Sequence, residues 1–418
     1  MRCARSFGRW ATVVCALLGT ARGAAAQAKW VGSWAAAQQV PEPANALPAE
    51  WLTDSTLRQI VHLSAGGTAL RIHLSNEFGT EPLRIDSVRV ARPVSIAGAK
   101  IDARVDFAVS FSGALAVAIP PGAEYVSDPV LISTAALADV AVTMHIEHAG
   151  PQQTGHPGSR ATSYVAHGNV AMASDLPDAK HIDHWYFLSG VDVSVSNRVS
   201  EPAAFSVVIL GDSITDGHAA TTNGNDRWPD VLAARLEGSS PRGQVGVLNE
   251  GIGGNHLLTD GLGPNALARF DRDVLAKAGV RYLIVLEGVN DLGGLTRMGE
   301  VPEADHQALV RSITSAYEQI VLRAHAEGIQ VYGATVLPYA GSDYYHPGPL
   351  NQQDLAAVNQ WIRAAGHFDA VIDFDAVMRD PEHPDRLLPA YDSGDHLHPS
   401  PAGYKKMGET VPAALFQH

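Results

Sequence analysis

The sequence predicts two structural units: an all-β sandwich over residues 27–200 and, after it, a three-layer α/β domain over residues 201–418 with a parallel sheet of five strands. Two observations predict them. In the first unit apolar and polar residues alternate with a period of two, whereas in the second unit continuous apolar runs alternate with patterns of helical period. A chain of 418 residues, 46% of them hydrophobic, is long enough to give each unit a core of its own.

Residues 1–26 have the features of a secretory signal peptide. They contain three arginines among the first nine residues, then a short apolar run, then small residues up to Ala26. We expect cleavage after Ala26. A membrane anchor is the alternative, but Arg22 interrupts the apolar run well before the ~20 residues that a span needs. The sequence therefore predicts a secreted or periplasmic protein.

The composition of the expected mature chain excludes several classes of function. Both cysteines, Cys3 and Cys15, lie in the leader, so disulfides, thiol catalysis and cysteine metal sites are excluded. Without the four arginines of the leader, 26 Lys and Arg stand against 44 Asp and Glu, which gives a formal charge of −18. This charge disfavours nucleic acid and anionic lipid as partners and suits a neutral substrate. No later segment is apolar for long enough to span a membrane.

The alternating pattern of the first unit is clearest in "ALRIHLSNEF", which begins at Ala69, and in "DVAVTMHIEH", which begins at Asp139. Such runs, separated by Gly, Pro and Asn, are typical of antiparallel strands with one buried face. Residues 148–160, "HAGPQQTGHPGSR", are rich in turn formers and predict a long loop. This loop is either a surface connection or a wall over a neighbouring site.

In the second unit, five short apolar runs predict the strands: "FSVVIL", "VGVLN", "VRYLIVLEG", "IQVYGATVL" and "AVIDF". Between them, helical periods occur in "PNALARFDRDVLAKAG", "HQALVRSITSAYEQIVLRAHAEG" and "NQQDLAAVNQWIRAAG". Strands that are apolar throughout and alternate with helices indicate a parallel sheet covered on both faces.

Chemically capable residues follow the predicted strands, where open α/β sheets bind their ligands. Acyl transfer needs a hydroxyl nucleophile, a neutral imidazole, a carboxylate that orients it, and donors for the oxyanion. Ser213 suits the nucleophile, His398 the base and Asp395 the orienting carboxylate. The oxyanion donors are expected to be the backbone N–H groups of Ser213 and Gly254 and the side-chain amide of Asn290.

Each of these residues has an alternative explanation. Ser213 alone is more often a turn or cap serine. The segment "DHLH" could hold a metal through His396 and His398, but the other strand ends offer no histidine pair and a hydroxyl nucleophile gives a metal no task. His396 is a second candidate for the base. We therefore expect neither a metal nor a cofactor.

The order of these segments matches one known pattern, because the α/β domain resembles the SGNH hydrolases, also called the GDSL esterase family. The resemblance covers roughly residues 205–416 and rests on Gly211-Asp212-Ser213, Gly254, Gly288 with Asn290, and Asp395 with His398. It implies a flavodoxin-like strand order, 2-1-3-4-5. It also implies a Ser213-His398-Asp395 triad and an oxyanion hole at Gly254 and Asn290.

Further segments are similar to the acetylxylan-esterase-like branch of this family, whose members carry an N-terminal β domain: "WVGSWAAAQ", "LRIHLSNEFGTEPL", "DRWPDVLAARL" and "ARFDRDVLAKAGVRYLIVLEGVND". This resemblance implies a carbohydrate O-deacetylase. Together with the leader, it predicts a secreted serine esterase that removes small acyl groups, above all acetate, from polysaccharides or oligosaccharides. We expect Asn255, Arg227 and Trp228 to contact the substrate. For Arg227 and Trp228, packing at a helix start is the alternative.

Two other functions stay open at this point. A general carboxylesterase, or a lipase or lysophospholipase, would use the same residues on longer acyl chains. An idle α/β domain beside a glycan-binding β sandwich is a third hypothesis, in which Trp30, Trp34 and Trp51 stack on sugar rings instead of packing in the core.

Overall fold

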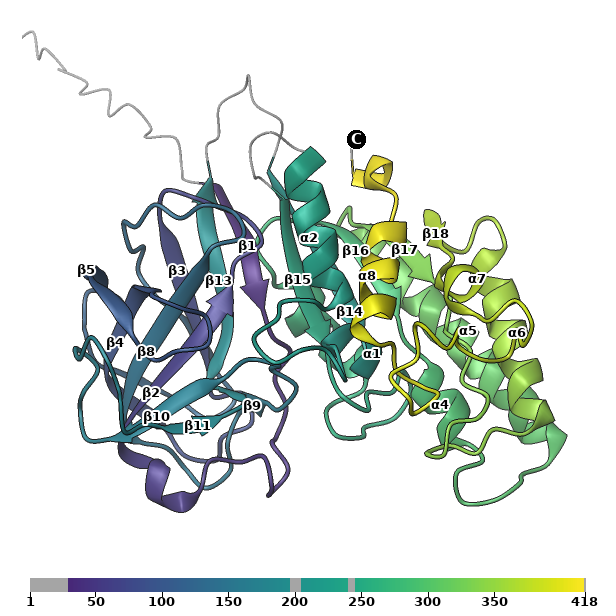
Figure 1. The fold of residues 1–418 in the computed structure, drawn as a ribbon, viewed down its shortest axis with the longest axis horizontal. Helices are drawn as coiled ribbons and strands as arrows, with labels where there is room; N and C mark the ends of the chain where they lie inside the picture. Colours follow the sequence, from purple (N-terminus) through teal and green to yellow (C-terminus); the bar gives the residue numbers. More distant parts are fainter. Residues whose placement is uncertain (1–28, 196–203, 240–244, 417–418) are drawn as a thin grey trace, which may run out of the picture.

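The computed structural model describes residues 29–195, 204–239 and 245–416. The expected signal peptide and the expected boundary between residues 200 and 201 lie outside the described residues. Figure 1 shows two units side by side, the β-rich one in purple and blue and the α/β unit in green and yellow. The sequence-based prediction of this fold class is confirmed.

Two antiparallel sheets form the first unit. The smaller sheet has the order β1 (Lys29–Ala35), β13 (Leu188–Val195), β3 (Leu70–Ser75) and β7 (Glu124–Val126). The larger has the order β11 (Lys180–Ile182), β10 (Ser163–His167), β2 (Thr53–His62), β8 (Asp139–His148), β4 (Leu83–Pro93) and β5 (Ile101–Val109), with β6 (Val117–Ile119) paired to β4. A 3-10 turn, η1 (Ala49–Trp51), precedes β2.

The two sheets enclose one apolar core. Ile72 and Val191 from the smaller sheet and Leu57, Val90 and Met144 from the larger sheet belong to a single buried cluster. This explains the period of two, because successive side chains of a strand point alternately into the core and away from it. Of the three tryptophans considered for glycan binding, Trp34 is only 5% exposed and packs edge-on against Trp185.

A short antiparallel strand pair involves the predicted loop at residues 148–160. Strand β9 (Gly155–His156) lies antiparallel to β12 (Trp185–Tyr186), with His156 opposite Trp185. The loop is therefore partly ordered by backbone pairing, which its many turn-forming residues did not indicate.

The sheet of the second unit is parallel throughout and has the order β15 (Val245–Gly251), β14 (Phe205–Gly211), β16 (Val280–Leu286), β17 (Gln330–Ala334) and β18 (Ala370–Ile372). This is the order 2-1-3-4-5. Every residue of the interior strand β14 is buried, which accounts for its continuous apolar sequence.

Helices cover both faces of this sheet. Right-handed crossovers place α2 (Trp228–Ser239) on one face, together with α7 (Phe374–Met378) and α8 (Pro401–Thr410). The connections from β15 to β16, from β16 to β17 and from β17 to β18 contain α3 (Ala266–Phe270), α5 (Glu303–Ala326) and α6 (Pro349–Arg363), which lie on the opposite face. The shorter elements are α1 (Ser213–Asp216), η2 (Asp271–Leu275), α4 (Val289–Gly294) and η3 (Ala413–Phe416).

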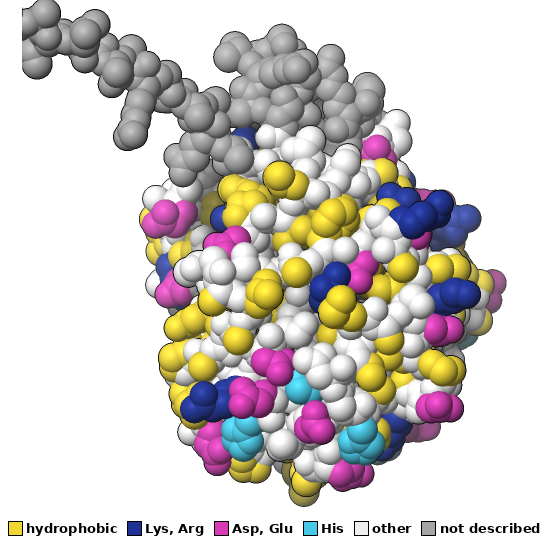
Figure 2. Space-filling model, turned by 90° about the vertical axis from the view of Figure 1, so that its left-hand side faces the viewer, with side chains coloured by type: hydrophobic (Ala, Val, Ile, Leu, Met, Phe, Trp, Pro, Cys, Tyr) yellow, Lys and Arg dark blue, Asp and Glu magenta, His cyan; other side chains and the backbone are white. Residues whose placement is uncertain are grey.

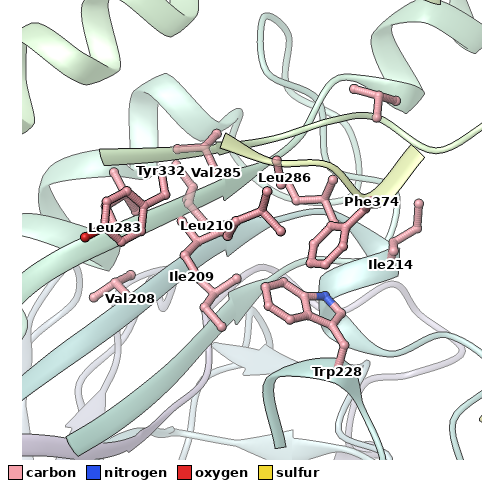
Figure 3. Packing of buried hydrophobic residues seen from close by; sticks show 14 of the residues in the cluster. Val208, Ile209, Leu210, Ile214, Trp228, Leu283, Val285, Leu286, Tyr332 and Phe374 are labelled. Atoms are coloured by element: carbon pink, nitrogen blue, oxygen red, sulfur yellow. The ribbon is translucent and has the colours of Figure 1, made fainter. Parts of the chain in front are cut away.

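The core of the α/β unit is a second buried cluster, which Figure 3 shows between the central strands and Trp228 and Phe374. Leu210 and Leu286 come from adjacent strands, and the rings of Trp228 and Phe374 meet edge to face with centroids 5.2 Å apart. The sheet and the helix face thus pack through large apolar side chains from distant parts of the sequence.

The two units are joined by close contacts that centre on β1 and β15 and include the neighbouring residues Ser64 and Ala278. The N–H of Gly32 donates to the carbonyl of Ala278 at 2.9 Å, and the N–H of Val247 donates to Ser64 Oγ at 2.8 Å. A Cβ atom at Gly246 would lie 1.8 Å from the carbonyl oxygen of Gly32, so only glycine permits this approach. The first unit is therefore packed directly on the edge of the parallel sheet.

The outer face of the β sandwich is mixed in character. Figure 2 shows Lys and Arg side chains singly or in small groups between acidic and apolar ones, with histidines near the lower edge. Among the described residues, no helix combines the length and the apolar character that crossing a membrane would require.

Candidate active site

The candidate site lies where strand β14 and its two neighbours, β15 and β16, end. Ser213 follows β14 directly, Gly254 lies in the loop after β15, and Asn290 is in α4 after β16. The strand order places these three ends side by side, because the chain leaves β14 toward β15 on one side and returns to β16 on the other.

Ser213 is the first residue of the four-residue helix α1. Asp212 caps this helix, with Oδ1 accepting a hydrogen bond from the N–H of Ile214 at 2.8 Å. A Cβ atom at Gly211 would lie 2.2 Å from Thr215 Oγ1, so glycine allows α1 to fold back tightly on the strand. Within the described part of the chain, the N–H of Ser213 donates no hydrogen bond. The hydroxyl and the free N–H thus arise at one tight turn.

A chain of short hydrogen bonds joins Ser213 to His398 and Asp395. Ser213 Oγ is 2.8 Å from His398 Nε2, and His398 Nδ1 is 2.6 Å from Asp395 Oδ2. Because a carboxylate only accepts, the proton of the neutral ring lies on Nδ1 and leaves Nε2 free to accept from the serine. Nucleophilic acyl transfer requires this arrangement.

The turn that carries Asp395 and His398 is fixed by its own backbone. Asp395 Oδ1 accepts hydrogen bonds from the N–H groups of Leu397 at 3.0 Å and His398 at 2.8 Å. Ser400 caps α8, and Pro401 is its first residue. Partial burial by itself raises the pKa of Asp395, but these hydrogen bonds and that of the His398 ring outweigh it and hold the pKa well below its usual range. Asp395 is therefore a carboxylate wherever the protein is folded at ordinary pH.

The structure does not bring His396, the second candidate for the base, to Ser213. Its Nδ1 pairs with Asp392 Oδ2 at 2.6 Å, and its side chain is about half exposed. As to metal ligands, His218, Asp395 and His398 form one group among the described residues whose ligand atoms lie within 4.8 Å of one another. Asp395 and His398 already take part in the hydrogen-bonded chain to Ser213. His396 does not belong to this group, so His396 and His398 do not form the pair of metal ligands considered from the sequence.

Three donors face the region beside Ser213. Gly254 has a positive φ of 68°, and its N–H donates to no other described residue. Asn290 Oδ1 accepts from the hydroxyl of Tyr345 at 2.5 Å, and its Nδ2 donates to the carbonyl of Asn255 at 2.6 Å. These two bonds fix the amide orientation and leave the second N–H of Nδ2 free. With the N–H of Ser213, these groups are suited to stabilise an oxyanion.

The site opens into a cleft of about 660 Å³. Polar groups and a wall of larger apolar side chains both line it. The lining residues are Ser213, His218, Gly253, Gly254, Leu262, Asn290, Asp343, Tyr344, Tyr345, Gly394, Asp395, Leu397 and His398. Leu262 and Tyr344 stay 46% and 53% exposed, so an apolar surface continues out of the cleft. Ser213 is only 7% exposed, at its base.

His218 is a cleft residue that the sequence analysis missed. Its ring lies 4.1 Å from the ring of His398, and its Nε2 is 4.0 Å from Asp395 Oδ2. Burial, the adjacent His398 and Arg160 lower the pKa of His218 to about 4. A neutral imidazole at this position limits rotation of the His398 ring without adding charge. In the sequence, the one indication of this role was that His218 lies just after the helix that begins at Ser213.

Arg269 is a second residue that the sequence analysis missed. This buried side chain donates to the carbonyls of Gly211 at 3.0 Å and Glu250 at 2.7 Å, and to Asn255 Oδ1 at 3.0 Å. It thereby ties together the segments that follow β14 and β15. Asp273, 3.0 Å from Arg269, balances its charge. Because the guanidinium is rigid and planar, it fixes the relative positions of these loops.

The structure does not bring Asn255, Arg227 or Trp228 into the cleft. Asn255 is fully buried and its Nδ2 donates to the carbonyl of Pro264 at 2.8 Å. Arg227 pairs with Asp230 at 2.9 Å at the start of α2. Trp228 is 0% exposed in the core. In place of the predicted substrate contacts, Arg227 and Trp228 pack at the start of α2 and Asn255 supports a loop. The start of α2 faces the interior of the protein.

Replacing Trp228 with alanine is expected to lower the free energy of unfolding by about 3–5 kcal/mol, since a large buried side chain leaves a cavity. Urea denaturation measures this change. The KM of the remaining folded protein should stay close to that of the parent. If the free energy of unfolding were unchanged and KM were raised, Trp228 would instead contact the substrate.

Comparison with known proteins gives one family match. Residues 209–406 match the model of the GDSL-like Lipase/Acylhydrolase family. No curated protein matches the chain significantly.

Solved structures resemble about half of the chain. A G-D-S-L family protein from Desulfitobacterium hafniense is 26% identical over 49% of this chain and 97% of its own, with a TM-score of 0.35. A GDSL-like lipase from Bacteroides thetaiotaomicron is 20% identical over 52% and 92%, with a TM-score of 0.38. A variant of an acetyl xylan esterase from Geobacillus stearothermophilus is 20% identical over 50% and 94%, with a TM-score of 0.37.

Proposed function

Because residues 209–406 of this chain match the model of the GDSL-like lipase and acylhydrolase family, we propose that the protein is a serine esterase that removes short acyl groups, above all acetate, from polysaccharides or oligosaccharides. The observation that carries the proposal is the hydrogen-bonded chain from Ser213 through His398 to Asp395 at the base of an open cleft. Acylated carbohydrate is the substrate class, and no cofactor takes part.

In the first step, Ser213 Oγ attacks the ester carbonyl carbon while His398 Nε2 takes its proton. The carbonyl oxygen becomes an oxyanion that accepts hydrogen bonds from the N–H groups of Ser213 and Gly254 and from Asn290 Nδ2. Asp395 stabilises the imidazolium formed at His398. The imidazolium then gives its proton to the leaving alcohol, and an acyl group remains on Ser213.

In the second step, His398 takes a proton from a water molecule, which attacks the acyl carbon. The same donors bind the second oxyanion. Collapse of this intermediate breaks the bond to Ser213 Oγ, releases the carboxylic acid and returns the proton to the serine. Each step uses only side chains and backbone groups of the chain itself.

Two features support a carbohydrate ester. The tyrosine ring of Tyr344 is half exposed at the cleft and lies edge-on to Tyr345, with the guanidinium of Arg297 4.1 Å from its centroid. A ring held in this way can pack on the apolar face of a sugar. The acidic chain also suits a neutral polymer.

A second candidate is a carboxylesterase or lipase for longer acyl chains. The exposed Leu262 and Tyr344 favour it, since an apolar surface leading out of the cleft could hold an alkyl chain. The two candidates differ in how activity depends on acyl length.

Acetate release from acetylated xylan by the purified chain tests the proposal, with aryl esters of increasing acyl length beside it. We expect release of acetate and a preference for aryl acetate over longer esters. A preference for long chains without acetate release would favour the lipase. Inactivity on every ester would leave the glycan-binding hypothesis.

We also propose that the protein is exported after cleavage behind Ala26, on the basis of the leader sequence. N-terminal sequencing of the protein recovered outside the cytoplasm is expected to begin at Gln27. Recovery of an uncleaved chain from the cytoplasm would contradict it.

A further inference from the structure

The N-terminal β unit reaches the helix that carries Ser213. His156, from β9, is 3% exposed and lies between two acceptors of different units. Its Nδ1 is 2.7 Å from the carbonyl of Ala37, and its Nε2 is 2.9 Å from Asp216 Oδ1. Asp216 is also 3% exposed and is the last residue of α1. One side chain of the β unit is thus bonded directly to the short helix of the candidate site.

With Asp216 as a carboxylate, both bonds of His156 require the ring to be an imidazolium. A backbone carbonyl and a carboxylate only accept hydrogen bonds, so both ring nitrogens must carry a proton. Burial and the nearby Arg227 oppose the charged form, but Asp216 and the carbonyl of Ala37 outweigh them, and the pKa of His156 is raised above its ordinary value. His156 and Asp216 therefore form a buried pair of opposite charges between the two units.

Close backbone contacts surround the same end of α1. A Cβ atom at Gly158 would lie 1.8 Å from Asp216 Oδ2, and one at Gly251 would lie 2.3 Å from the nitrogen of Asp216. Asp216 is thus enclosed by glycine backbone, with Gly158 of the β unit against its carboxylate and Gly251 at the end of β15 against its own backbone. No side chain larger than hydrogen fits at Gly158 unless Asp216 moves.

The contact continues past α1 toward the cleft. Arg160 Nε donates to the carbonyl of Gly217 at 3.1 Å, and an Arg160 nitrogen is 3.4 Å from His218 Nδ1. Beyond it, the N–H of Thr162 donates to Asn223 Oδ1 at 2.8 Å. Residues 156–162 therefore follow residues 216–223 along their length.

A helix of four residues does not hold its own orientation, because one turn closes too few hydrogen bonds. Asp212 fixes the start of α1, and the end is fixed by the contacts just described. We propose that residues 156–160 of the β unit belong to the esterase site, and that His156 is a positioning residue which holds α1, and with it Ser213, through Asp216. This inference rests on the proposed esterase function and gives the β unit a task in it.

The test compares His156→Gln and Asp216→Asn with the parent on an aryl acetate. We expect each variant to lower kcat by roughly 10–100-fold with KM within about twofold, because displacement of the nucleophile by about 1 Å is enough for such a loss. The double variant is expected to lose no more than either single one, since both remove the same pair.

Ser64→Ala is the matched control. Ser64 also forms a buried bond between the units, to the N–H of Val247, but it lies near the start of β15, away from Ser213. We expect this variant to lower Tm while kcat is unchanged. If His156→Gln and Asp216→Asn also lowered only Tm, the pair would serve the interface alone and the inference would be wrong.

Two further measurements keep the outcome decisive. Gly158→Ala disturbs Asp216 without removing a polar group, so it tests the inference if His156→Gln does not fold, and we expect it to lower kcat as well.

The second measurement is the rate at which a fluorophosphonate labels Ser213, which needs no ester substrate. If the parent is labelled but hydrolyses no ester, the proposed function fails. Equal labelling rates in parent and Gly158→Ala would overturn the positioning role.

Discussion

Replacing Ser213 with alanine is expected to lower kcat on an aryl acetate by about 10⁴–10⁶-fold, because no other described hydroxyl lies within hydrogen-bonding distance of His398 Nε2. The oxyanion donors and the cleft stay in place, so a small residual rate above that of the uncatalysed reaction should remain. Active-site labelling should disappear together with kcat.

The folded state should tolerate this substitution. The side chain of Ser213 has His398 as its hydrogen-bond partner among the described residues, so Tm should change little. Ser206→Ala is a control on the same strand: Ser206 Oγ donates to the carbonyl of Ala278 at 2.7 Å, at the opposite end of β14. It should lower Tm and keep kcat. Hydrolysis by the Ser213→Ala variant at the parental rate would exclude the serine mechanism.

Replacing Asp395 with asparagine is expected to lower kcat by roughly 10³–10⁴-fold. An asparagine amide can donate to His398 Nδ1, which then carries no proton and leaves the proton on Nε2. In that tautomer Nε2 no longer accepts the proton of Ser213. The ratio of kcat to KM, measured on purified folded protein, gives the loss directly.

His396→Gln is the matched control for this variant, because His396 is the neighbouring imidazole of the same loop and pairs with Asp392 instead. We expect it to keep kcat within about threefold. A loss in His396→Gln as large as that in Asp395→Asn would identify His396 as the base.

The lowered pKa of Asp395 determines what it contributes to the pH profile. A carboxyl whose pKa falls on folding contributes stability that is present above its unfolded pKa of about 3.9 and lost as pH falls through the lower folded value. His218, with a pKa of about 4, is a neutral imidazole above pH 5. Neither Asp395 nor His218 is therefore expected to add a titration step to the pH profile of kcat between pH 5 and 8.

Local patterns were sufficient to predict most of the fold. The run "FSVVIL" is apolar throughout because β14 is an interior strand buried on both faces. The run "DVAVTMHIEH" alternates because Val140, Val142, Met144 and Ile146 of β8 face the core between the two sheets, although the residues between them are buried as well. The segment "PNALARFDRDVLAKAG" was predicted as one helix but forms α3 followed by the π-helical turn η2. Its periodicity is that of an α-helix, and periodicity does not register an added residue in one turn.

Residues that lie at strand ends were also predictable in position. Ser213, Gly254 and Asn290 follow predicted strands, and the strand order alone brings them together. The positions of side chains that depend on which way a helix or strand faces were not predictable. Trp228 at the start of α2 could point toward the cleft or the core, and only the packing of α2 against Phe374 decides for the core.

The sequence by itself determined the two kinds of sheet and the alternation of strands and helices, and it gave Ser213, Asp395 and His398 as the candidate set, because these follow from periodicity and from short segments at strand ends. Only the tertiary structure decided what His156, His218 and Arg269 do. Each of them acts on residues of another segment: His156 on Asp216, His218 on His398, and Arg269 on Gly211. Such contacts leave no local pattern, because they arise only when separate segments pack together.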